Sequence, residues 1–380
     1  MSVSGVGSTE PPRSGDAGFA GVGAGSSGVG STEPPKSAGG GFAGAEAGRQ
    51  LNMSEALNEA LHEEMERDPG VFVIGEDIAQ MGGLFQVTAG LLDRFGPQRV
   101  IDAPISEAAQ AGAGVGAALV GCRPVVELQI ADFVSLVMDQ VVNHAGKWRY
   151  MSGGRVTVPF VLRGAISSGI GMAAQHSQTL ESWFVHAPGL VVIMPSTPYD
   201  AKGLLKSAIR DDNPVVFLEK RLLYSRPGPV PTGEYTVPIG VADVKREGSD
   251  VTVATYAAGV HLALQAARQF ARDGIELEVI DLRTLKPLDL ETVVSSVQKT
   301  GRLVVVTEAA RAGSFASEVV ARVCGEAFAA LRSPPVRVAA EDVPIPYAAP
   351  LERAVLPQVE DVVAGVNAAL ERAPVEEASV

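Results

Sequence analysis

From residue 51 onward, short apolar runs alternate with segments in which apolar side chains recur every three or four positions. The runs predict buried strands, and the recurring positions predict helices with one apolar face. Runs that are apolar throughout are typical of parallel sheets covered by helices on both faces. The chain is therefore predicted to be an α/β protein. The predicted strands are 71–74, 158–162, 190–194, 215–218, 251–254, 277–280, 303–307 and 336–338, and the later helices lie near 259–273, 289–299 and 314–331.

Two helix starts can be predicted from their capping residues. Ser54 is the candidate cap of a helix whose Leu57, Leu61 and Met65 share one face. Thr197 is the candidate cap of another, because Pro198 suits a first turn and an acid follows at position 200. The glycines of 112–116 lie inside a third helical segment, where they are expected to serve packing.

The alternation lapses in two places. Residues 225–249 are rich in Pro, Gly and charge, which predicts a boundary between two doubly wound domains, at 51–236 and 237–372. Residues 1–50 form a disordered linker in this interpretation, because they are rich in Gly, Ser and Pro, with 5–12 recurring as 28–35. This linker has no secretory core and carries acids that are unusual in transit peptides, so a cytoplasmic location is expected.

Charge and composition exclude several classes of function. The net charge of −13 has no basic block to offset it, so partners such as nucleic acid or anionic membrane are not expected. The longest apolar stretch, 111–122, is shorter than the roughly 20 residues of a bilayer-spanning helix. Cys122 and Cys324 are far apart, which favours reduced thiols over a disulfide framework or a metal cluster.

The familiar catalytic motifs are missing. The sequence contains no Walker loop, no dinucleotide fingerprint after a strand, no Gly-x-Ser-x-Gly elbow and no His-Glu-x-x-His pair. Its five histidines show no spacing typical of metal ligands. Kinase, hydrolase and zinc-enzyme functions therefore have no support.

One acid has an unusual setting. Glu107 precedes an almost wholly apolar segment of mostly small residues, 108–120, that could lie close against a neighbouring backbone or a flat ligand. A glutamate in a first turn is commonly there for the helix dipole alone. A carboxylate that is also shielded from water is typical of sites that move protons.

Three further segments carry candidate chemistry. Residues 75–85 follow a predicted strand, where ligand-binding loops of α/β sheets lie. Residues 127–133 place an aromatic side chain just past a short apolar run, and 175–178 place a histidine in a polar loop. Taken singly, each could equally be structural: a turn, a core aromatic residue, or a histidine with satisfied hydrogen bonds.

Together and in this order, the segments resemble the beta subunits of the decarboxylating component of 2-oxo acid dehydrogenase complexes, over about residues 51–370. That group includes the pyruvate and branched-chain enzymes, with acetoin dehydrogenase as a near relative. The resemblance implies a transketolase pyrimidine-binding domain followed by a transketolase C-terminal domain. The residues that carry it are 75–85, 105–107, 129–133, 139–143, 150–153, 175–178, 195–203, 209–214, 278–284, 299–302 and 315–318.

The resemblance also implies a cofactor, thiamine diphosphate, and a role for individual residues. Glu107 would hydrogen-bond a ring nitrogen of the aminopyrimidine and favour the tautomer that removes the thiazolium proton. Phe133 would stack on the pyrimidine, with Gln129 and Glu76 lining the same pocket. His176 would face the reacting centre, since a histidine can change charge near neutral pH. A potassium ion is expected at the main-chain carbonyls of Ala208, Asp211 and Asn213.

One absence implies partners. The family holds its diphosphate and magnesium with a Gly-Asp-Gly motif, which this sequence lacks. That motif belongs to a separate alpha subunit, so an α2β2 heterotetramer is expected, docked on a lipoyl acyltransferase core. Pyruvate is the preferred substrate, with 2-oxoisovalerate and acetoin as alternatives. A different hypothesis is that the chain is an assembly module without a working site.

Overall fold

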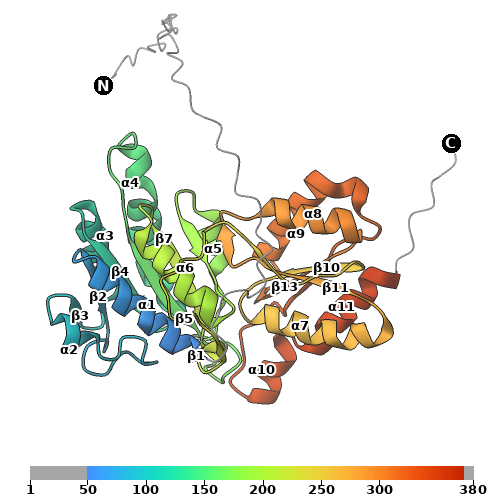
Figure 1. The fold of residues 1–380 in the computed structure, drawn as a ribbon, viewed down its shortest axis with the longest axis horizontal. Coiled ribbons are helices and arrows are strands. Elements are labelled where there is room, and N and C mark those ends of the chain that lie inside the picture. The colour runs from blue at the N-terminus through green and yellow to red at the C-terminus, as the bar shows by residue number, and fades with distance from the viewer. Residues whose placement is uncertain (1–48, 372–380) are drawn as a thin grey trace, which may run out of the picture. The chain divides into compact units, whose positions relative to one another are not determined.

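The computed structural model describes residues 49–371. The predicted linker, 1–50, lies outside the described residues apart from its last two positions. Within the described part of the chain, two sheets with helices packed against them form the framework shown in Figure 1. The predicted α/β fold with parallel-rich sheets is confirmed.

The first sheet has seven strands in the order β12-β6-β7-β5-β4-β2-β3. All neighbours are parallel except the edge pair β12–β6. That edge strand comes from the second half of the chain, so the first sheet is completed across the predicted domain boundary. The strands are β2 (Val71–Gly75), β3 (Val100–Asp102), β4 (Arg123–Leu128), β5 (Val161–Ile166), β6 (Val191–Ile193), β7 (Val215–Lys220) and β12 (Thr284–Lys286).

Helices cover both faces of this sheet, as the apolar strands require. On one face, α1 (Met53–Arg67) and α6 (Pro198–Arg210) pack together over side chains such as Val73, Val125 and Phe217. On the other face, α3 (Glu107–Leu119) packs over Val126 and Leu162. Shorter helices complete this half: α2 (Leu91–Phe95), η1 (Ala131–Val137), η2 (Asp139–Ala145), α4 (Gly146–Met151), α5 (Glu181–His186) and η3 (Arg221–Leu223).

The second sheet has the order β14-β13-β10-β11-β9, with only β9 antiparallel. Its strands are β9 (Asp243–Arg246), β10 (Val251–Thr255), β11 (Leu277–Asp281), β13 (Leu303–Ala310) and β14 (Val336–Ala340). One face is covered by α7 (Ala258–Phe270) and α11 (Val359–Glu371), the other by α8 (Leu290–Thr300) and α9 (Phe315–Ala327). The remaining elements are η4 (Ala271–Asp273), η5 (Phe328–Ala330) and α10 (Ala349–Val355).

The core runs on from the first sheet to the second. A single cluster of buried side chains joins Phe184 and Leu218 of the first half to Tyr256, Ile280 and Phe315 of the second. The boundary predicted at 236/237 therefore separates two sheets but not two independent cores, and the predicted domain limits remain a prediction.

Several local predictions can be compared with the structure. Thr197 caps α6 as expected, with its side chain accepting from Asp200 N. The Ser54 cap is wrong: Asn52 caps α1 and forms a capping box with Glu55. The strand predicted at 158–162 begins at Val161, because Pro159 has no N–H to donate to a ladder.

The segment at 225–249 is more ordered than its composition suggests. It contains β9 and also β8 (Pro227–Pro229), which pairs with β1 (Gln50–Asn52). These short edge strands are rich in Pro, Gly and charged residues, which do not favour strands by themselves. They form because each pairs with a strand that is distant in sequence. Cys122 and Cys324 are free and half-buried.

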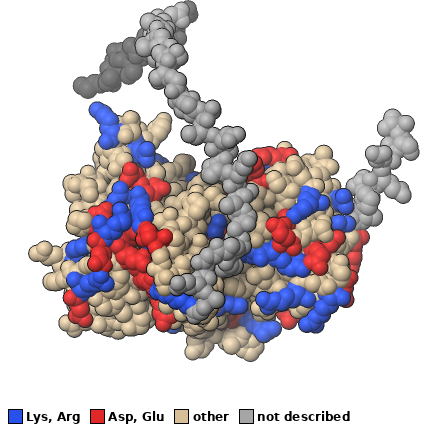
Figure 2. Space-filling model, in the orientation of Figure 1, with Lys and Arg blue, Asp and Glu red and all other residues tan. Residues whose placement is uncertain are grey.

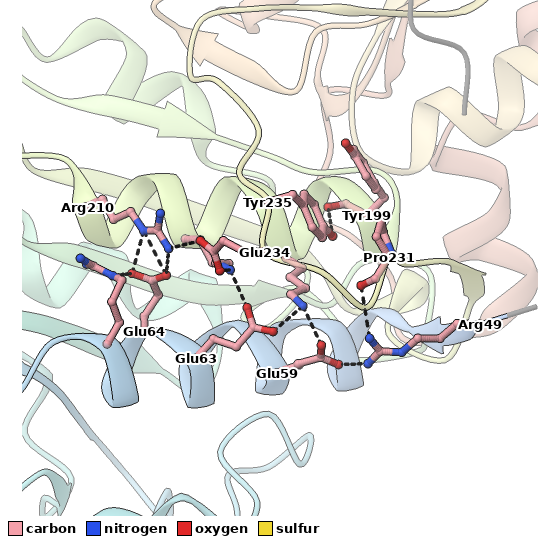
Figure 3. A network of polar contacts seen from close by, with 12 residues as sticks. Arg49, Glu59, Glu63, Glu64, Tyr199, Arg210, Pro231, Glu234 and Tyr235 are labelled. Carbon is pink, nitrogen blue, oxygen red and sulfur yellow. Dashed lines mark hydrogen bonds and ion pairs between the residues drawn. The ribbon is translucent and has the colours of Figure 1, made fainter. Parts of the chain in front are cut away.

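The contact between α1 and α6 is reinforced by alternating charges (Figure 3). Lys202 and Lys206 are fully buried side chains on α6, and both amines reach Glu63 of α1. Arg210 continues the row, with Nη2 2.5 Å from Glu64 Oε1 and 2.6 Å from Glu234 Oε1. These pairs hold the two helices at one relative position along their length.

On the face shown in Figure 2, acidic and basic side chains lie interspersed. In the stretch 49–371, no helix combines the length and apolar character needed to cross a membrane.

Candidate active site

The predicted cofactor-binding residues lie at one edge of the first sheet. Glu76 directly follows β2, Gln129 directly follows β4, and Glu107 begins the helix that follows β3. These three strands are parallel neighbours, so their carboxyl ends meet at the same edge. Phe133 lies just beyond, in η1. This edge is where open α/β sheets bind ligands.

Glu107 is buried but has no partner. Its residue is 7 % exposed, and its carboxylate forms no hydrogen bond or ion pair with any residue in 49–371. The carboxylate oxygens keep solvent-accessible surface, so a hydrogen-bonding group from outside the described chain can reach them. Glu107 lies in the first turn of α3, where the positive end of the helix dipole favours a negative charge.

One turn further along α3, Gln110 connects the helix to Glu76. Its Nε2 donates to Glu76 Oε1 at 2.9 Å and to the Pro104 carbonyl at 3.2 Å, while its Oε1 is buried without a partner among the described residues. Glu76 and the first turn of α3 are thereby held together. Sequence reasoning missed Gln110, although its position one turn after Glu107 on the same helix was a usable signal.

The loop after β2 reaches Gln129 as well. Gln129 Nε2 donates to Asp77 Oδ2 at 3.1 Å, and Asp77 itself has a left-handed backbone with φ of 55°. This bond aligns the ends of β2 and β4. The structure therefore brings Glu76, Gln129 and Glu107 to one edge through intermediate partners.

Phe133 and His176 contact each other directly. Their rings meet edge to face, with centroids 5.4 Å apart and planes at 79°. Both side chains are half-buried. His176 comes from the loop that follows β5, which lies beside β4 in the sheet. The predicted aromatic and the predicted histidine therefore share one site.

Asp132 ties these two segments together and was missed from the sequence. Its Oδ1 accepts from Gln178 N at 3.0 Å and from Gln178 Nε2 at 2.9 Å. Its Oδ2 is buried without a partner in the described chain. Burial raises the pKa of Asp132 above its ordinary value, against the opposing effects of Gln178 and His176. Asp132 is thus a candidate to hold a proton, or to hydrogen-bond a ligand, at the edge of the site.

A second group that sequence reasoning missed lies on adjacent strands within the sheet. Arg163 of β5 pairs with Glu127 of β4 on one side and with Glu219 of β7 on the other, and Tyr224 donates to Glu219. Burial raises the pKa of Glu127, although Arg163 opposes this. Charged residues inside otherwise apolar strands were the available signal. The group links three neighbouring strands, two of which, β4 and β5, lead into the segments of the site.

The predicted potassium loop lies elsewhere. Ala208 is in the last turns of α6, and Asp211 and Asn213 lead into β7, at the opposite end of the sheet from Glu107. The carbonyls of Ile209 and Asp211 each accept from Arg123 Nη1 at 3.0 Å. A cation bound here would share the Asp211 oxygen with this guanidinium. In the described part of the chain, no group of three His, Cys, Asp or Glu side chains could hold a metal ion.

Two hollows of the described chain lie away from the predicted site. A cavity of about 700 Å³ lies against α1, and one of about 230 Å³ lies at 79–93. Neither is lined by Glu76, Glu107, Gln129, Phe133 or His176.

Comparison with known families covers most of the chain. The family described as transketolase, pyrimidine binding domain, matches residues 49–227. The family described as transketolase, C-terminal domain, matches residues 240–362. A solved split-gene transketolase, described as an inactive beta4 tetramer, has a TM-score of 0.69 at 24 % identity, over 84 % of this chain and 98 % of that chain. That likeness shows the fold.

Closer relatives have functional names. The pyruvate dehydrogenase E1 component subunit beta of Rhizobium meliloti is 47 % identical, covering 84 % of this chain and 69 % of the relative. The 2-oxoisovalerate dehydrogenase subunit beta of Bacillus subtilis is 48 % identical, covering 79 % of this chain and 92 % of the relative. The acetoin:2,6-dichlorophenolindophenol oxidoreductase subunit beta of Cupriavidus necator is 45 % identical, covering 84 % of this chain and 97 % of the relative. The chain therefore belongs to the E1 beta subunits of the 2-oxo acid dehydrogenase family, built from transketolase pyrimidine-binding and C-terminal domains.

Proposed function

We propose that this chain provides the aminopyrimidine half of a thiamine diphosphate site, in an enzyme that oxidatively decarboxylates a 2-oxo acid and passes the acyl group to a lipoyl carrier. The observation that carries the proposal is Glu107, a residue that is 7 % exposed and whose carboxylate has no partner in 49–371. When bound, the cofactor supplies a nucleophilic carbon that adds to the oxo group and accepts the electrons released with carbon dioxide.

The chain's own residues would bind and orient that cofactor. Glu107 is placed to share a proton with a ring nitrogen, because it begins α3 at the carboxyl ends of the strands and has no other partner in 49–371. Phe133 offers an aromatic face for a flat ring. Glu76 and Gln129 line the same sheet edge, held by Gln110 and Asp77 respectively.

His176 is proposed to act at the reacting end of the site. Its contact with Phe133 places it beside the proposed cofactor-binding face. A histidine there can stabilise negative charge on the substrate or assist transfer of the acyl group, since its ring can donate a hydrogen bond. Its role is separable by experiment from that of Glu107.

The site is proposed to be a half-site completed by an alpha subunit. The 380 residues contain no Gly-Asp-Gly motif for magnesium and diphosphate. Ile105, Leu136, Tyr150 and Met151 near α3 and α4 are exposed apolar side chains, with Tyr150 88 % exposed. Such residues fit an interface. We further propose an α2β2 heterotetramer docked on a lipoyl acyltransferase core, and a location in the cytoplasm.

Pyruvate is the proposed substrate, with 2-oxoisovalerate and acetoin as alternatives. Overall identity does not separate them, because relatives named for all three are 45–48 % identical to this chain. The segments 150–153 and 337–342 favour pyruvate or acetoin. Direct comparison of the three substrates decides between them.

Potassium at Ala208, Asp211 and Asn213 is a separate part of the proposal. Its support is the resemblance and the presence of carbonyl oxygens, one of which already serves Arg123. We expect a higher melting temperature in potassium chloride than in choline chloride at equal ionic strength. Equal melting temperatures would remove potassium from the proposal.

The test is decarboxylation by the chain alone and after co-expression with its alpha subunit. We expect activity only in the mixture, and a loss of at least about 100-fold in Glu107→Gln with assembly intact. Glu66→Gln, an exposed acid on α1, is the matched control and should keep full activity. An assembled Glu107→Gln enzyme with undiminished activity would instead establish an assembly module.

A further inference from the structure

The loop that carries His176 is held by a carboxylate from the far end of the chain. Gly169 N donates to Glu352 Oε1 at 2.7 Å, and Gly171 N donates to Glu352 Oε2 at 2.9 Å. Glu352 lies on α10, in the second half of the chain, and is 3 % exposed. Both oxygens of one buried carboxylate are therefore directed at the backbone of the loop.

The glycines make this arrangement possible. Gly169 and Gly171 have φ of 89° and 74°, a left-handed conformation that other residues adopt at a cost. With Ile170 between them, both N–H groups point to the same carboxylate. Hydrogen bonds to an ionised acceptor are stronger than neutral ones, so the clamp restrains the loop more than ordinary turn bonds would.

The loop is tied on its other sides by the first half of the chain. Lys220 donates to Ser168 Oγ, just before the glycines. Asp132 holds Gln178, just after the histidine. His176 lies between these ties, so its ring contact with Phe133 depends on where both ends of the loop are fixed.

We propose that Glu352 is a positioning residue that places His176 for the reaction. This inference rests on the proposed role of His176. Removing the acceptor leaves two backbone N–H groups to be satisfied by water, and the loop then samples positions in which His176 leaves the edge of Phe133. The residues that would hold the cofactor, Glu107 and Phe133, belong to other elements and keep their positions.

The first measurement is amide exchange across residues 167–176 in the assembled heterotetramer. In Glu352→Ala we expect exchange at Gly169 and Gly171 to accelerate at least tenfold. In Glu352→Gln, which keeps one carbonyl acceptor and the side-chain shape, we expect a smaller acceleration. Glu360→Gln is the matched control, because Glu360 is exposed and contacts only Arg353 at 3.9 Å among the described residues. Its exchange pattern should equal that of the parent.

The second measurement separates positioning from general damage. We expect Glu352→Gln to lower kcat for lipoyl acylation about tenfold, with the KM for the 2-oxo acid and the half-saturating concentration of thiamine diphosphate within twofold of the parent. Combining Glu352→Gln with His176→Ala should add no further loss beyond His176→Ala alone.

The outcomes distinguish failure of the proposed role of His176 from failure of the inference about Glu352. Full acyl transfer by His176→Ala would refute the proposed role of His176, and the inference with it, while the half-site proposal for Glu107 would stand. Impaired His176→Ala together with unchanged exchange and kcat in Glu352→Gln and Glu352→Ala would overturn the inference alone. Strictly additive losses in the double variant would also overturn it.

Discussion

Lys245 Nζ lies 2.7 Å from Asp200 Oδ2, joining β9 at the edge of the second sheet to α6 on the first. Arg283 Nη1 approaches the other oxygen of the same carboxylate at 2.8 Å. Asp200 is fully buried, and burial alone would raise its pKa. The two cations outweigh burial and hold the pKa of Asp200 below its ordinary value. This acid therefore couples the two halves of the chain.

Asp200→Ala should destabilise the protein strongly. Removing Asp200 leaves Lys245 and Arg283 charged and buried with only the more exposed Asp243 and the more distant Asp281 nearby, and breaking a buried ion pair typically costs about 3–5 kcal/mol. Urea unfolding measures the change in the free energy of unfolding. Asp273→Asn, at an exposed position, is the control and should stay within about 0.5 kcal/mol of the parent. A change equally small in Asp200→Ala would show that the pair does not couple the halves.

Because of Glu181, we expect the free energy of unfolding of the protein to decline as pH rises. Burial raises the pKa of Glu181 from 4.5 to about 7, and Tyr256 of the second half donates to its Oε1 at 2.8 Å. The folded state then binds a proton that the unfolded state has lost, so the free energy of unfolding falls as pH rises from 4.5 to about 7, by roughly 3 kcal/mol at most.

Glu181→Gln removes that proton equilibrium. We expect urea unfolding at pH 5 and pH 8 to show a smaller difference in the variant than in the parent, with the variant gaining at pH 8. Glu326→Gln, an exposed acid on α9, should leave the difference unchanged. A parent-like pH dependence in Glu181→Gln would refute this assignment.

Two glycines on α3 should respond oppositely to alanine. A Cβ at Gly114 would lie 2.6 Å from Val126 Cγ2 and 2.9 Å from Phe160 Cε2, so Gly114→Ala should cost about 1–3 kcal/mol. A Cβ at Gly116 meets nothing within 4 Å in the described chain, so Gly116→Ala should stabilise by up to about 1 kcal/mol through helix propensity. Thermal unfolding of the beta chain compares them, and the same sign for both would contradict this packing.

Phe133→Ala should weaken cofactor binding more than it affects folding. Losing the aromatic face should raise the half-saturating concentration of thiamine diphosphate by about tenfold in the assembled enzyme. Phe328→Ala removes an aromatic ring that is 73 % exposed and should leave that concentration unchanged. If both variants behaved alike in an activity titration, Phe133 would not be part of the binding face.

Much of the fold follows from local pattern. Continuous apolar runs such as 71–74 and 215–218 could be recognised as buried strands, because only a sheet covered on both faces accommodates them. Thr197 and Pro198 marked a helix start for equally local reasons. β1, β8 and β12 could not be found in this way, since each is a short segment defined by a partner distant in sequence.

The candidate site shows the same difference between residues that local sequence predicts and contacts that depend on distant segments. Glu107, Phe133 and His176 were predicted as site residues from their segments, because the residue types and their order carry the family resemblance. The partners Gln110, Asp132 and Glu352 act through hydrogen bonds to segments far along the chain, and no spacing in the sequence encodes those contacts.

Local sequence thus decided which residues form strands, helices and candidate chemistry, since propensity, capping and burial periodicity act over a few residues. Tertiary structure alone decided that Glu107 is buried without a partner, that Phe133 meets His176, and that a carboxylate from α10 holds the histidine loop. The physical reason is that desolvation and hydrogen-bond geometry depend on what packs nearby in space, whatever its distance along the chain.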